Sequence, residues 1–233
     1  MRYLQKAAQK LAHTLRQAQG ERISLLPFVV SLSNHMAMNS RRDIHAPRRL
    51  FHMAAASLFP MLALLLDERT FLPLLLAITA LFVLSDVARL RVARLNLWFR
   101  KLFGLLLRQG EERRVTGASY ILLGTLGAFV LFSRDAAALA VLFTALGDPA
   151  AAMVGIRFPG KPIFGKSLWG TAAMVAVGLA VAGAMQVAGV IDFRWAIAVG
   201  ALVAGIAELL PLPLDDNLRV PLLAGAAMSL LGA

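Results

Sequence analysis

The sequence contains no cysteine, and only four of its 233 residues are histidine. The absence of cysteine excludes disulfide bonds, cysteine-ligated zinc and iron–sulfur clusters. The histidines are scattered along the chain, which argues against a metal cage built from imidazoles. Charged residues are also scarce, at 16% of the chain, and the 13 acids are outnumbered by 24 lysines and arginines. A metal site in this chain would therefore depend on oxygen ligands from a small set of acids.

Apolar residues dominate what remains. They make up 59% of the chain, and the mean hydropathy is +0.71. Several apolar runs approach the roughly 20 residues that span about 30 Å of hydrocarbon. The composition therefore predicts an all-α, polytopic integral membrane protein with about seven transmembrane helices. The predicted spans are residues 50–66, 70–88, 116–133, 136–156, 168–190, 194–210 and 218–232.

The basic residues are distributed unevenly between the connecting segments. Of the 24 lysines and arginines, all but Arg69, Arg134 and Arg194 fall in segments 1–49, 89–114, 157–166 and 211–219. By the positive-inside rule this predicts a cytosolic N-terminus and, with seven spans, an external C-terminus. The net charge of +11 would indicate nucleic acid in a soluble protein, but here it follows the membrane topology. We therefore expect the lipid bilayer, and no nucleic acid, as a partner.

The N-terminal segment 1–47 is predicted to be cytosolic or interfacial, and residues 48–233 to form the membrane-embedded catalytic domain. Apolar residues recur at helical spacing over residues 1–22, with basic residues around them, which predicts an amphipathic interfacial helix. Residues 23–40 are broken by polar residues and Pro27, which favours an interfacial or re-entrant segment. Residues 89–114 alternate basic with apolar and aromatic residues and predict a second interfacial helix. No signal peptide is expected.

The stretch LGDPAAAMVGIRFPGKPIFGKSLWGT, residues 146–171, contains an acid inside an apolar segment. Ionisable groups at membrane depth are usually functional, so Asp148 is a candidate site residue. Pro149 has no N–H to donate to the carbonyl of Ala145, which predicts a kink and a free acceptor near the carboxylate. The alternative is a kinked packing helix with an inert, paired acid. Small residues at intervals of four, from Gly147 to Gly155, predict close packing against another helix.

The segment GKPIFGKS, residues 160–167, matches the pattern of a phosphate-binding loop. That motif should follow a β-strand, whereas here it follows an apolar helix, so we exclude the soluble nucleotide-hydrolase fold. The local chemistry still favours an anion, because free amides at a helix N-terminus lie beside Lys161 and Lys166. The alternative is an ordinary cytosolic turn. Gly160, Gly165 and Ser167 complete this candidate nucleotide-binding loop.

The last polar cluster is AELLPLPLDDNLRVP, residues 207–221. Glu208 lies at the predicted cytosolic end of the sixth span, and Asp215, Asp216 and Asn217 directly precede the seventh. Oxygen ligands of this kind suit Mg²⁺. The alternative is that the residues before the helix only cap it. Because Asp148 and Lys166 are predicted on the same membrane face, we favour the functional interpretation.

Two further groups of charged residues have structural interpretations. Asp86 and Arg89 lie one helical turn apart, and a salt bridge at a helix end and a role in a site remain equally open. Glu111 and Glu112 stand beside arginines before Thr116, which is typical of a capped, solvated turn. A role as general base for a lipid hydroxyl remains open for these acids, as it does for Asp148.

Taken together, these motifs resemble those of the membrane kinases that include dolichol kinase, phytol kinase and CTP-dependent diacylglycerol kinase, which are distantly similar to phosphatidate cytidylyltransferases. The resemblance covers about residues 50–222, in the order that the family has them. Its motifs are RRLFH at 48–52, TGASYILLG at 116–124, GDPAAAMVG at 147–155, GKSLWGT at 165–171 and AELLPLPLDDNLRVPL at 207–222.

The resemblance implies Mg²⁺-dependent phosphoryl transfer, typically from CTP, to the hydroxyl of a membrane lipid alcohol at the cytosolic face. By matching position, it implies a nucleotide and metal site formed by Asp148, Lys166, Ser167, Glu208, Asp215, Asp216 and Asn217, together with Arg49 and His52. We expect Asp148, Asp215 and Asp216 to hold the metal, and Asp148, Lys166 and Glu208 to act in catalysis. Several family members have an acid at the position of Trp169, so that acid has no role here.

Two alternative functions use the same residues. A cytidylyltransferase would take the same donor and metal but release pyrophosphate and form a CDP-lipid. An ion-coupled transporter would use Asp148 and Glu208 along a pathway, although transporters often have repeated halves and none is visible here. The acceptor remains open between polyprenol, a phytol-like isoprenoid and diacylglycerol, and CTP rather than ATP follows from the resemblance alone.

Overall fold

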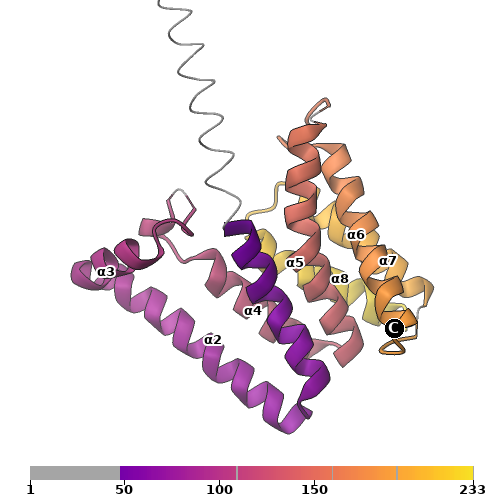
Figure 1. Ribbon diagram of the computed structural model, residues 1–233, viewed down its shortest axis with the longest axis horizontal. Helices are drawn as coiled ribbons and strands as arrows, with labels where there is room; N and C mark the ends of the chain where they lie inside the picture. Colours follow the sequence, from indigo (N-terminus) through magenta and orange to yellow (C-terminus); the bar gives the residue numbers. More distant parts are fainter. Residues whose placement is uncertain (1–47, 109, 159, 193, 233) are drawn as a thin grey trace, which may run out of the picture. The chain divides into compact units, whose positions relative to one another are not determined.

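The computed structural model describes residues 48–108, 110–158, 160–192 and 194–232 (Figure 1). Within these ranges the chain forms helices joined by turns, and its one β feature there is an isolated bridge between Ile163 and Lys166. The predicted all-α class is confirmed. The interfacial segments predicted within residues 1–47 lie outside the described residues.

Each predicted span contains a helix of similar extent. The first described helix covers residues 48–65. The others are α2 (Glu68–Arg91), α3 (Ala93–Phe103), α4 (Gly117–Leu131), α5 (Arg134–Arg157), α6 (Leu168–Val187), α7 (Trp195–Leu209) and α8 (Asp216–Leu230), and a 3-10 turn covers Glu111–Arg113. Four of these helices begin at residues whose side chains accept an amide N–H of the first turn, namely Asp67, Thr116, Ser133 and Asp215. The sequence therefore fixes these helix starts locally.

Three helices, α2, α5 and α6, are long and apolar enough to cross a membrane. The helices α4 and α7 are also apolar but shorter. Large apolar side chains are exposed along the outside of the bundle, among them Leu65, Leu76 and Val130. A lipid surround accepts such side chains, whereas water does not, so these features indicate an integral membrane protein.

The central helix is α5, which lies between the 48–65 helix and α6, with α8 behind it in the view of Figure 1. The predicted small-residue face of α5 packs against α6. A Cβ atom on Gly147 would lie 2.7 Å from Cγ of Met174, and one on Gly170 would lie 2.7 Å from the carbonyl oxygen of Ala151. Only glycine permits the two helices to approach so closely. The close helix packing predicted from the spacing of the small residues is therefore confirmed.

Two apolar cores flank α5. One joins α5 to α6, α7 and α8 around Phe143, Met174 and Met228. The other joins α5 to α4, α2 and the 48–65 helix, and includes Phe71 and Phe129, whose ring centroids are 4.8 Å apart. Because α5 is packed on both sides, its backbone is held in place. The packing therefore positions the side chains of α5 that lie toward α7 and α8.

Candidate active site

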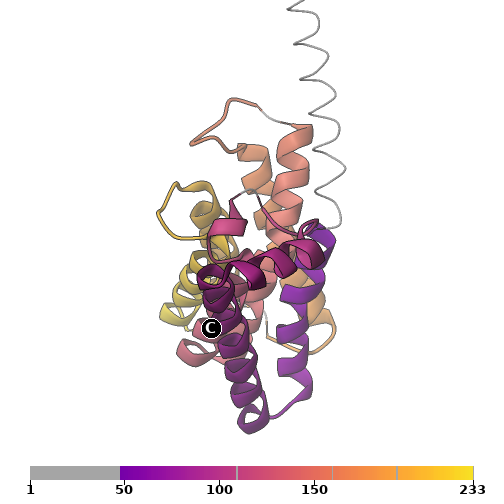
Figure 2. The same cartoon turned by 90° about the vertical axis from the view of Figure 1, so that its left-hand side faces the viewer.

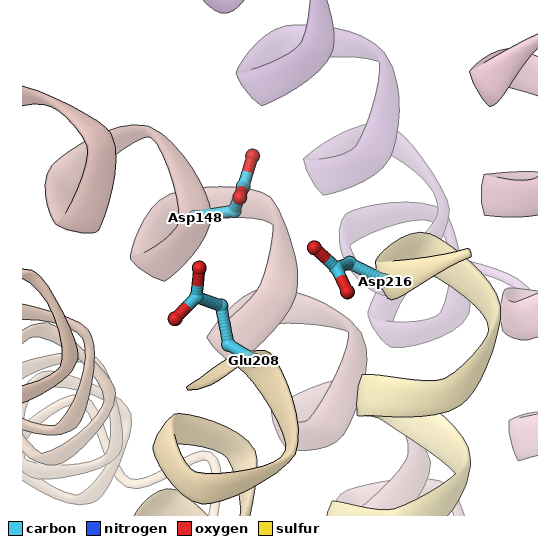
Figure 3. A group of neighbouring side chains, drawn as sticks. All are labelled: Asp148, Glu208 and Asp216. Carbon is cyan, nitrogen blue, oxygen red and sulfur yellow. The ribbon is translucent and has the colours of Figure 1, made fainter. Parts of the chain in front are cut away.

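Three carboxylates from three helices converge at one end of the bundle (Figure 3). One oxygen atom from each of Asp148 on α5, Glu208 on α7 and Asp216 on α8 lies within 4.8 Å of the other two. We call these residues the carboxylate triad. The chain order explains the geometry, because Glu208 is in the last turn of α7 and Asp216 is the first residue of α8. The proline-containing connection between them reverses the chain and brings both acids to the same level.

Lys166 reaches the triad from the loop between α5 and α6. Its Nζ atom lies 2.7 Å from Oε1 of Glu208 and 3.0 Å from Oδ2 of Asp216, and it also donates to the carbonyl oxygen of Glu208. Burial alone would lower the pKa of the Lys166 ammonium, but its hydrogen bond to Glu208 and the charge of Asp216 raise it instead. Lys166 is therefore held in its charged form.

A tight turn aims this lysine at the carboxylates. Ile163 and Lys166 exchange both backbone hydrogen bonds, at 2.9 and 3.0 Å. The two residues between them, Phe164 and Gly165, have φ of 52° and 82°, which is the backbone of a type I′ turn. The GKPIFGKS segment thus forms a two-residue reverse turn that ends at Lys166.

The other described candidate residues of this loop do not contact the triad carboxylates. Lys161 is exposed, as are Gly160 and Gly165. Ser167 precedes α6 but does not cap it, because its hydroxyl donates to the carbonyl oxygen of Phe158 at 2.8 Å. The amides of the first turn of α6 therefore have no side-chain cap, which keeps them available to an anion.

Arg219 is the second cation at the triad, and the sequence analysis missed it. Its Nη2 atom is paired with Oδ1 of Asp216 and lies 3.4 Å from the carbonyl oxygen of Glu208, while Nη1 donates to the carbonyl oxygen of Leu212 at 3.0 Å. Arg219 therefore anchors the α7–α8 connection. The spacing of Asp216 and Arg219, one helical turn apart, was the available signal.

Asp215 and Asn217, which flank Asp216, lie beside the triad. Oδ1 of Asp215 accepts the backbone N–H of Asn217 at 3.0 Å, so Asp215 caps α8 and lies outside the triad. Burial raises the pKa of the Asp215 carboxyl, and the charge of Asp216 acts in the same direction. Glu208 occupies the position in the cluster that the sequence analysis assigned to Asp215.

Several polar atoms around the triad lack partners. Among the described residues, none donates a hydrogen bond to the carboxylate of Asp148, and Nε of Arg219 and Nε2 of His52 are buried without a hydrogen-bond partner. His52 lies on the 48–65 helix. Arg49, one turn before it on the same helix, is half-buried. Buried polar atoms are normally paired, so these unpartnered atoms mark the region as a candidate binding site.

The donor set fits a divalent cation such as Mg²⁺. Three carboxylates within 4.8 Å of one another pair with two cations among the described residues, Lys166 and Arg219, so within this part of the chain the triad retains negative charge. Its ligand atoms are all oxygens, which Mg²⁺ prefers, and Mg²⁺ sites of this kind commonly use one or two carboxylates together with substrate phosphates and water.

A second polar cluster lies where α2 ends and α4 begins. Oδ1 of Asp86 pairs with Nε of Arg89 at 2.6 Å, and Oδ2 accepts from the amide and hydroxyl of Thr116, both at 2.8 Å, and from the hydroxyl of Ser119 at 2.6 Å. Arg89 also donates to Asn96 at 3.2 Å. We call these five residues the Asp86 cluster. Since both oxygens are saturated, the salt bridge at a helix end is the better of the two interpretations left open by the sequence.

The segment between the two clusters is a capped turn, as expected. Glu111 accepts the backbone N–H of Gly117 at 2.9 Å and that of Arg108 at 2.7 Å. Arg89 donates to the carbonyl oxygens of Glu111, at 3.1 Å, and Arg114, at 2.7 Å. A Cβ atom on Gly117 would lie 3.3 Å from Oε1 of Glu111 and 3.4 Å from Nδ2 of Asn217, so this turn reaches the edge of the candidate site.

Comparison with known proteins confirms the resemblance to CTP-dependent diacylglycerol kinases. The chain is 28% identical to CTP-dependent diacylglycerol kinase 1 of Saccharomyces cerevisiae over 138 residues, which is 57% of this chain and 47% of the yeast protein. It is 33% identical to the protein of the same name from Eremothecium gossypii over 113 residues, 47% of this chain and 35% of that protein. An uncharacterised protein of Rickettsia prowazekii is 28% identical over 132 residues, 55% of this chain and 64% of that protein.

These matches cover about a third to two thirds of the length of the curated relatives. No family model matches the chain. No solved structure matches it.

Proposed function

We propose that this protein is a CTP-dependent kinase that transfers a phosphoryl group to the hydroxyl of a membrane lipid alcohol. The observation that carries the proposal is the convergence of Asp148, Glu208 and Asp216 with Lys166 at one end of an apolar helix bundle. The similarity to two CTP-dependent diacylglycerol kinases supports the reaction type and the donor. A lipid alcohol matches the apolar surround of the site, and diacylglycerol is the acceptor that the names of these relatives favour.

The proposal includes seven transmembrane helices, namely the 48–65 helix, α2 and α4 to α8, with the active site facing the cytosol. Two of the basic connections, 157–166 and 211–219, meet at the triad through Lys166 and Arg219. The connections at the other end are joined by Arg134, which donates to the carbonyl oxygen of Leu66, and by Arg194, which donates to that of Gly232 at 2.6 Å. A soluble nucleotide would then reach the site from the cytosol, where the positive-inside rule puts the basic connections.

In the proposed reaction the γ-phosphorus of CTP forms a bond to the lipid hydroxyl oxygen, and the bond to the β-phosphate oxygen breaks. CDP leaves with that electron pair, and the hydroxyl proton is transferred to a base. Asp148 is the residue that we propose as this base, because none of the described residues donates a hydrogen bond to its carboxylate. A carboxylate without donors retains its lone pairs for a proton.

Asp148, Glu208 and Asp216 would hold Mg²⁺. When bound, the ion supplies positive charge that neutralises the nucleotide phosphates. Lys166 supplies a further fixed positive charge, since its ammonium is held at the triad by Glu208 and Asp216. The uncapped first turn of α6 offers backbone amides to the same phosphates. His52 and Arg49 contribute from the 48–65 helix, where Nε2 of His52 is buried and unpartnered. Positioning and charge therefore account for the proposed catalysis without a covalent intermediate.

The test is an incubation of the purified protein in detergent with Mg²⁺ and CTP that is radioactive in its γ-phosphate. Diacylglycerol, a polyprenol and phytol are supplied separately, and the lipid phase is extracted. Radioactivity in one lipid supports the kinase and names its acceptor, and a parallel reaction with ATP tests the donor. Pyrophosphate release that requires a phosphorylated lipid would instead establish a cytidylyltransferase. Inactivity in both assays would contradict the proposal and favour a transporter.

A further inference from the structure

Helix α3, Ala93–Phe103, lies outside the bundle. It follows α2 after a single residue, Val92, and runs across the direction of α2 (Figures 1 and 2). None of its residues is buried. Because α2 is a candidate membrane span, a helix that crosses its end lies along the plane of the membrane surface.

One face of α3 is attached to the protein. Asn96 accepts from Nη1 of Arg89 at 3.2 Å and donates to the carbonyl oxygen of Glu112 at 2.8 Å. The guanidinium carbon of Arg89 lies 4.4 Å from the centroid of the Phe99 ring. These contacts fix the rotation of α3 about its own axis, which decides the face that remains uncovered.

The uncovered face is apolar. Leu95, Trp98 and Leu102 follow one another at helical spacing, and Leu105 continues the row just beyond the helix. All four side chains are exposed, and 65% of Trp98 is accessible. Four large apolar residues in one row are costly in water, so this face fits an apolar partner.

One flank of this face is basic, and the other is formed by Phe99 and Phe103. Arg94 and Lys101 border the apolar row, Arg100 lies farther round, and the helix has no acidic residue. Nζ of Lys101 lies 5.7 Å from the centroid of the Trp98 ring, so a cation stands directly beside the exposed aromatic side chain. An apolar row bordered by cations and lying along the bilayer plane matches lipid whose headgroups are negatively charged.

We propose that α3 is a docking surface for anionic lipids, with its apolar row among the acyl chains and Arg94 and Lys101 on the headgroups. The charge complementarity favours this occupant over neutral lipid. The proposed phosphoryl transfer requires no such selectivity, so this surface is additional to the active site. Its attachment through Asn96 and Arg89 places it one contact from the Glu111 turn that borders the site.

The test uses Trp98 as a reporter in nanodiscs made of equal amounts of phosphatidylglycerol and phosphatidylcholine. The other two tryptophans are removed by Trp169→Phe and Trp195→Phe, and bromine is placed on the acyl chains of one lipid at a time. We expect brominated phosphatidylglycerol to quench Trp98 severalfold more than brominated phosphatidylcholine. The matched control keeps only Trp195, which is equally exposed at 64% but lies beside one arginine at the other end of the bundle, and should show no preference.

A second variant, Arg94→Gln with Lys101→Gln, should remove the preference while retaining the quenching, because it leaves the apolar row intact. Equal quenching of Trp98 by both lipids in the unsubstituted surface would overturn the proposal. An absence of quenching by either lipid would also overturn it, because another occupant, such as residues 1–47 or a second copy, would then cover the face. The measurement needs no kinase activity, so its failure and the failure of the proposed function are distinguishable.

Discussion

The molecule contains the same local pattern twice, an aspartate followed three residues later by an arginine, and uses it in two different ways. In the Asp86 cluster, the pair Asp86 and Arg89 has exposed fractions of 4% and 3%, and both oxygens of Asp86 are saturated. At the carboxylate triad, the pair Asp216 and Arg219 has exposed fractions of 29% and 5%. Nε of Arg219 has no partner among the described residues.

The difference lies in what surrounds each pair. Hydroxyls and an amide of Thr116 and Ser119 surround Asp86, so the first pair is balanced in charge and closed. Two further carboxylates, Glu208 and Asp148, surround Asp216, so the second site retains negative charge and open acceptors. A saturated cluster stabilises the fold, whereas an unsaturated one retains acceptors for a ligand. The predictions below test that distinction.

The largest effect is expected for Asp86→Asn. Removal of one charge from a buried pair leaves Arg89 uncompensated, which costs about 3–5 kcal/mol of the free energy of unfolding. We expect a marked drop in the unfolding temperature in detergent, followed by tryptophan fluorescence. The matched variant Asp216→Asn should lower the unfolding temperature less, because relief of repulsion among the triad carboxylates offsets the loss of the ion pair with Arg219. An equal loss of stability in both variants would contradict the distinction.

Asp148→Asn should have the complementary result. The amide cannot accept the hydroxyl proton and weakens the negative charge that holds a cation, so lipid phosphorylation should fall about 100- to 1,000-fold. The unfolding temperature should not decrease, since none of the described residues relies on a hydrogen bond to this carboxylate. Initial rates with radioactive CTP, measured beside thermal unfolding, check both statements. Full activity in this variant would refute the assignment of the site.

Two lysines of the same loop allow a further comparison within the site. Lys166→Ala removes the cation that contacts Glu208 and Asp216 and should lower the rate of phosphorylation about 100-fold. Lys161→Ala removes an exposed charge and should lower it by less than about tenfold, because an exposed charge is screened by salt. Rates at several CTP concentrations separate binding from turnover. A larger loss from Lys161 than from Lys166 would show that the turn is arranged differently when nucleotide is bound.

Much of this fold follows from the sequence, because each predicted span is a continuous apolar run and four helices, α2, α4, α5 and α8, begin at a capping residue. The packing face of α5 was also predictable, since glycine and alanine recur at intervals of four. Asp148 was identified because an acid next to proline in an apolar segment has few structural uses. The seven spans and the cytosolic orientation remain predictions.

The division of roles among neighbouring acids was not predictable. Asp215 and Asp216 are adjacent, and the residue at which α8 begins decides which of them caps the helix and which turns toward α7. A shift of one residue rotates a side chain by about 100°. The two aspartate–arginine pairs could not be separated either, because the partners of Asp86 come from residues 30 and 33 positions away. Such contacts depend on packing between helices, which local spacing does not encode.

A smaller effect is expected at Gly124, where α4 passes against α8 beside the site. A Cβ atom there would collide with the carbonyl oxygen of Asn217 and lie 3.1 Å from Cα of Leu218. Gly124→Ala should therefore cost about 1–3 kcal/mol of stability and displace the start of α8. The control is Gly183→Ala on α6, which meets nothing within 4 Å and should be neutral or stabilising. Equal unfolding temperatures for the two variants would contradict the close α4–α8 contact.

The smallest effect concerns Asp67, an exposed acid at the other end of the bundle that belongs to neither cluster. Its carboxylate accepts from the hydroxyl and the amide of Thr70, both at 3.0 Å, and these hydrogen bonds lower the pKa of Asp67 below its ordinary value of 3.8. The charged form is therefore favoured in the folded protein. Its contribution to stability is present above the ordinary pKa and is lost as the pH falls through the lowered one.

Asp67→Asn keeps the shape of the cap and removes only the titration. The unsubstituted protein should have a slightly higher unfolding temperature than this variant at pH 7, and the gap should close as the pH falls below the lowered pKa, where Asp67 is protonated in both folded and unfolded chains. A gap that persists at low pH would show that the shape of the side chain, and not its charge, stabilises the start of α2. Asp67 is exposed and lies away from both clusters, so Asp67→Asn should change the unfolding temperature slightly and leave the rate of phosphorylation unchanged. The substitutions in the Asp86 cluster and in the carboxylate triad should have larger effects on stability and on activity, respectively.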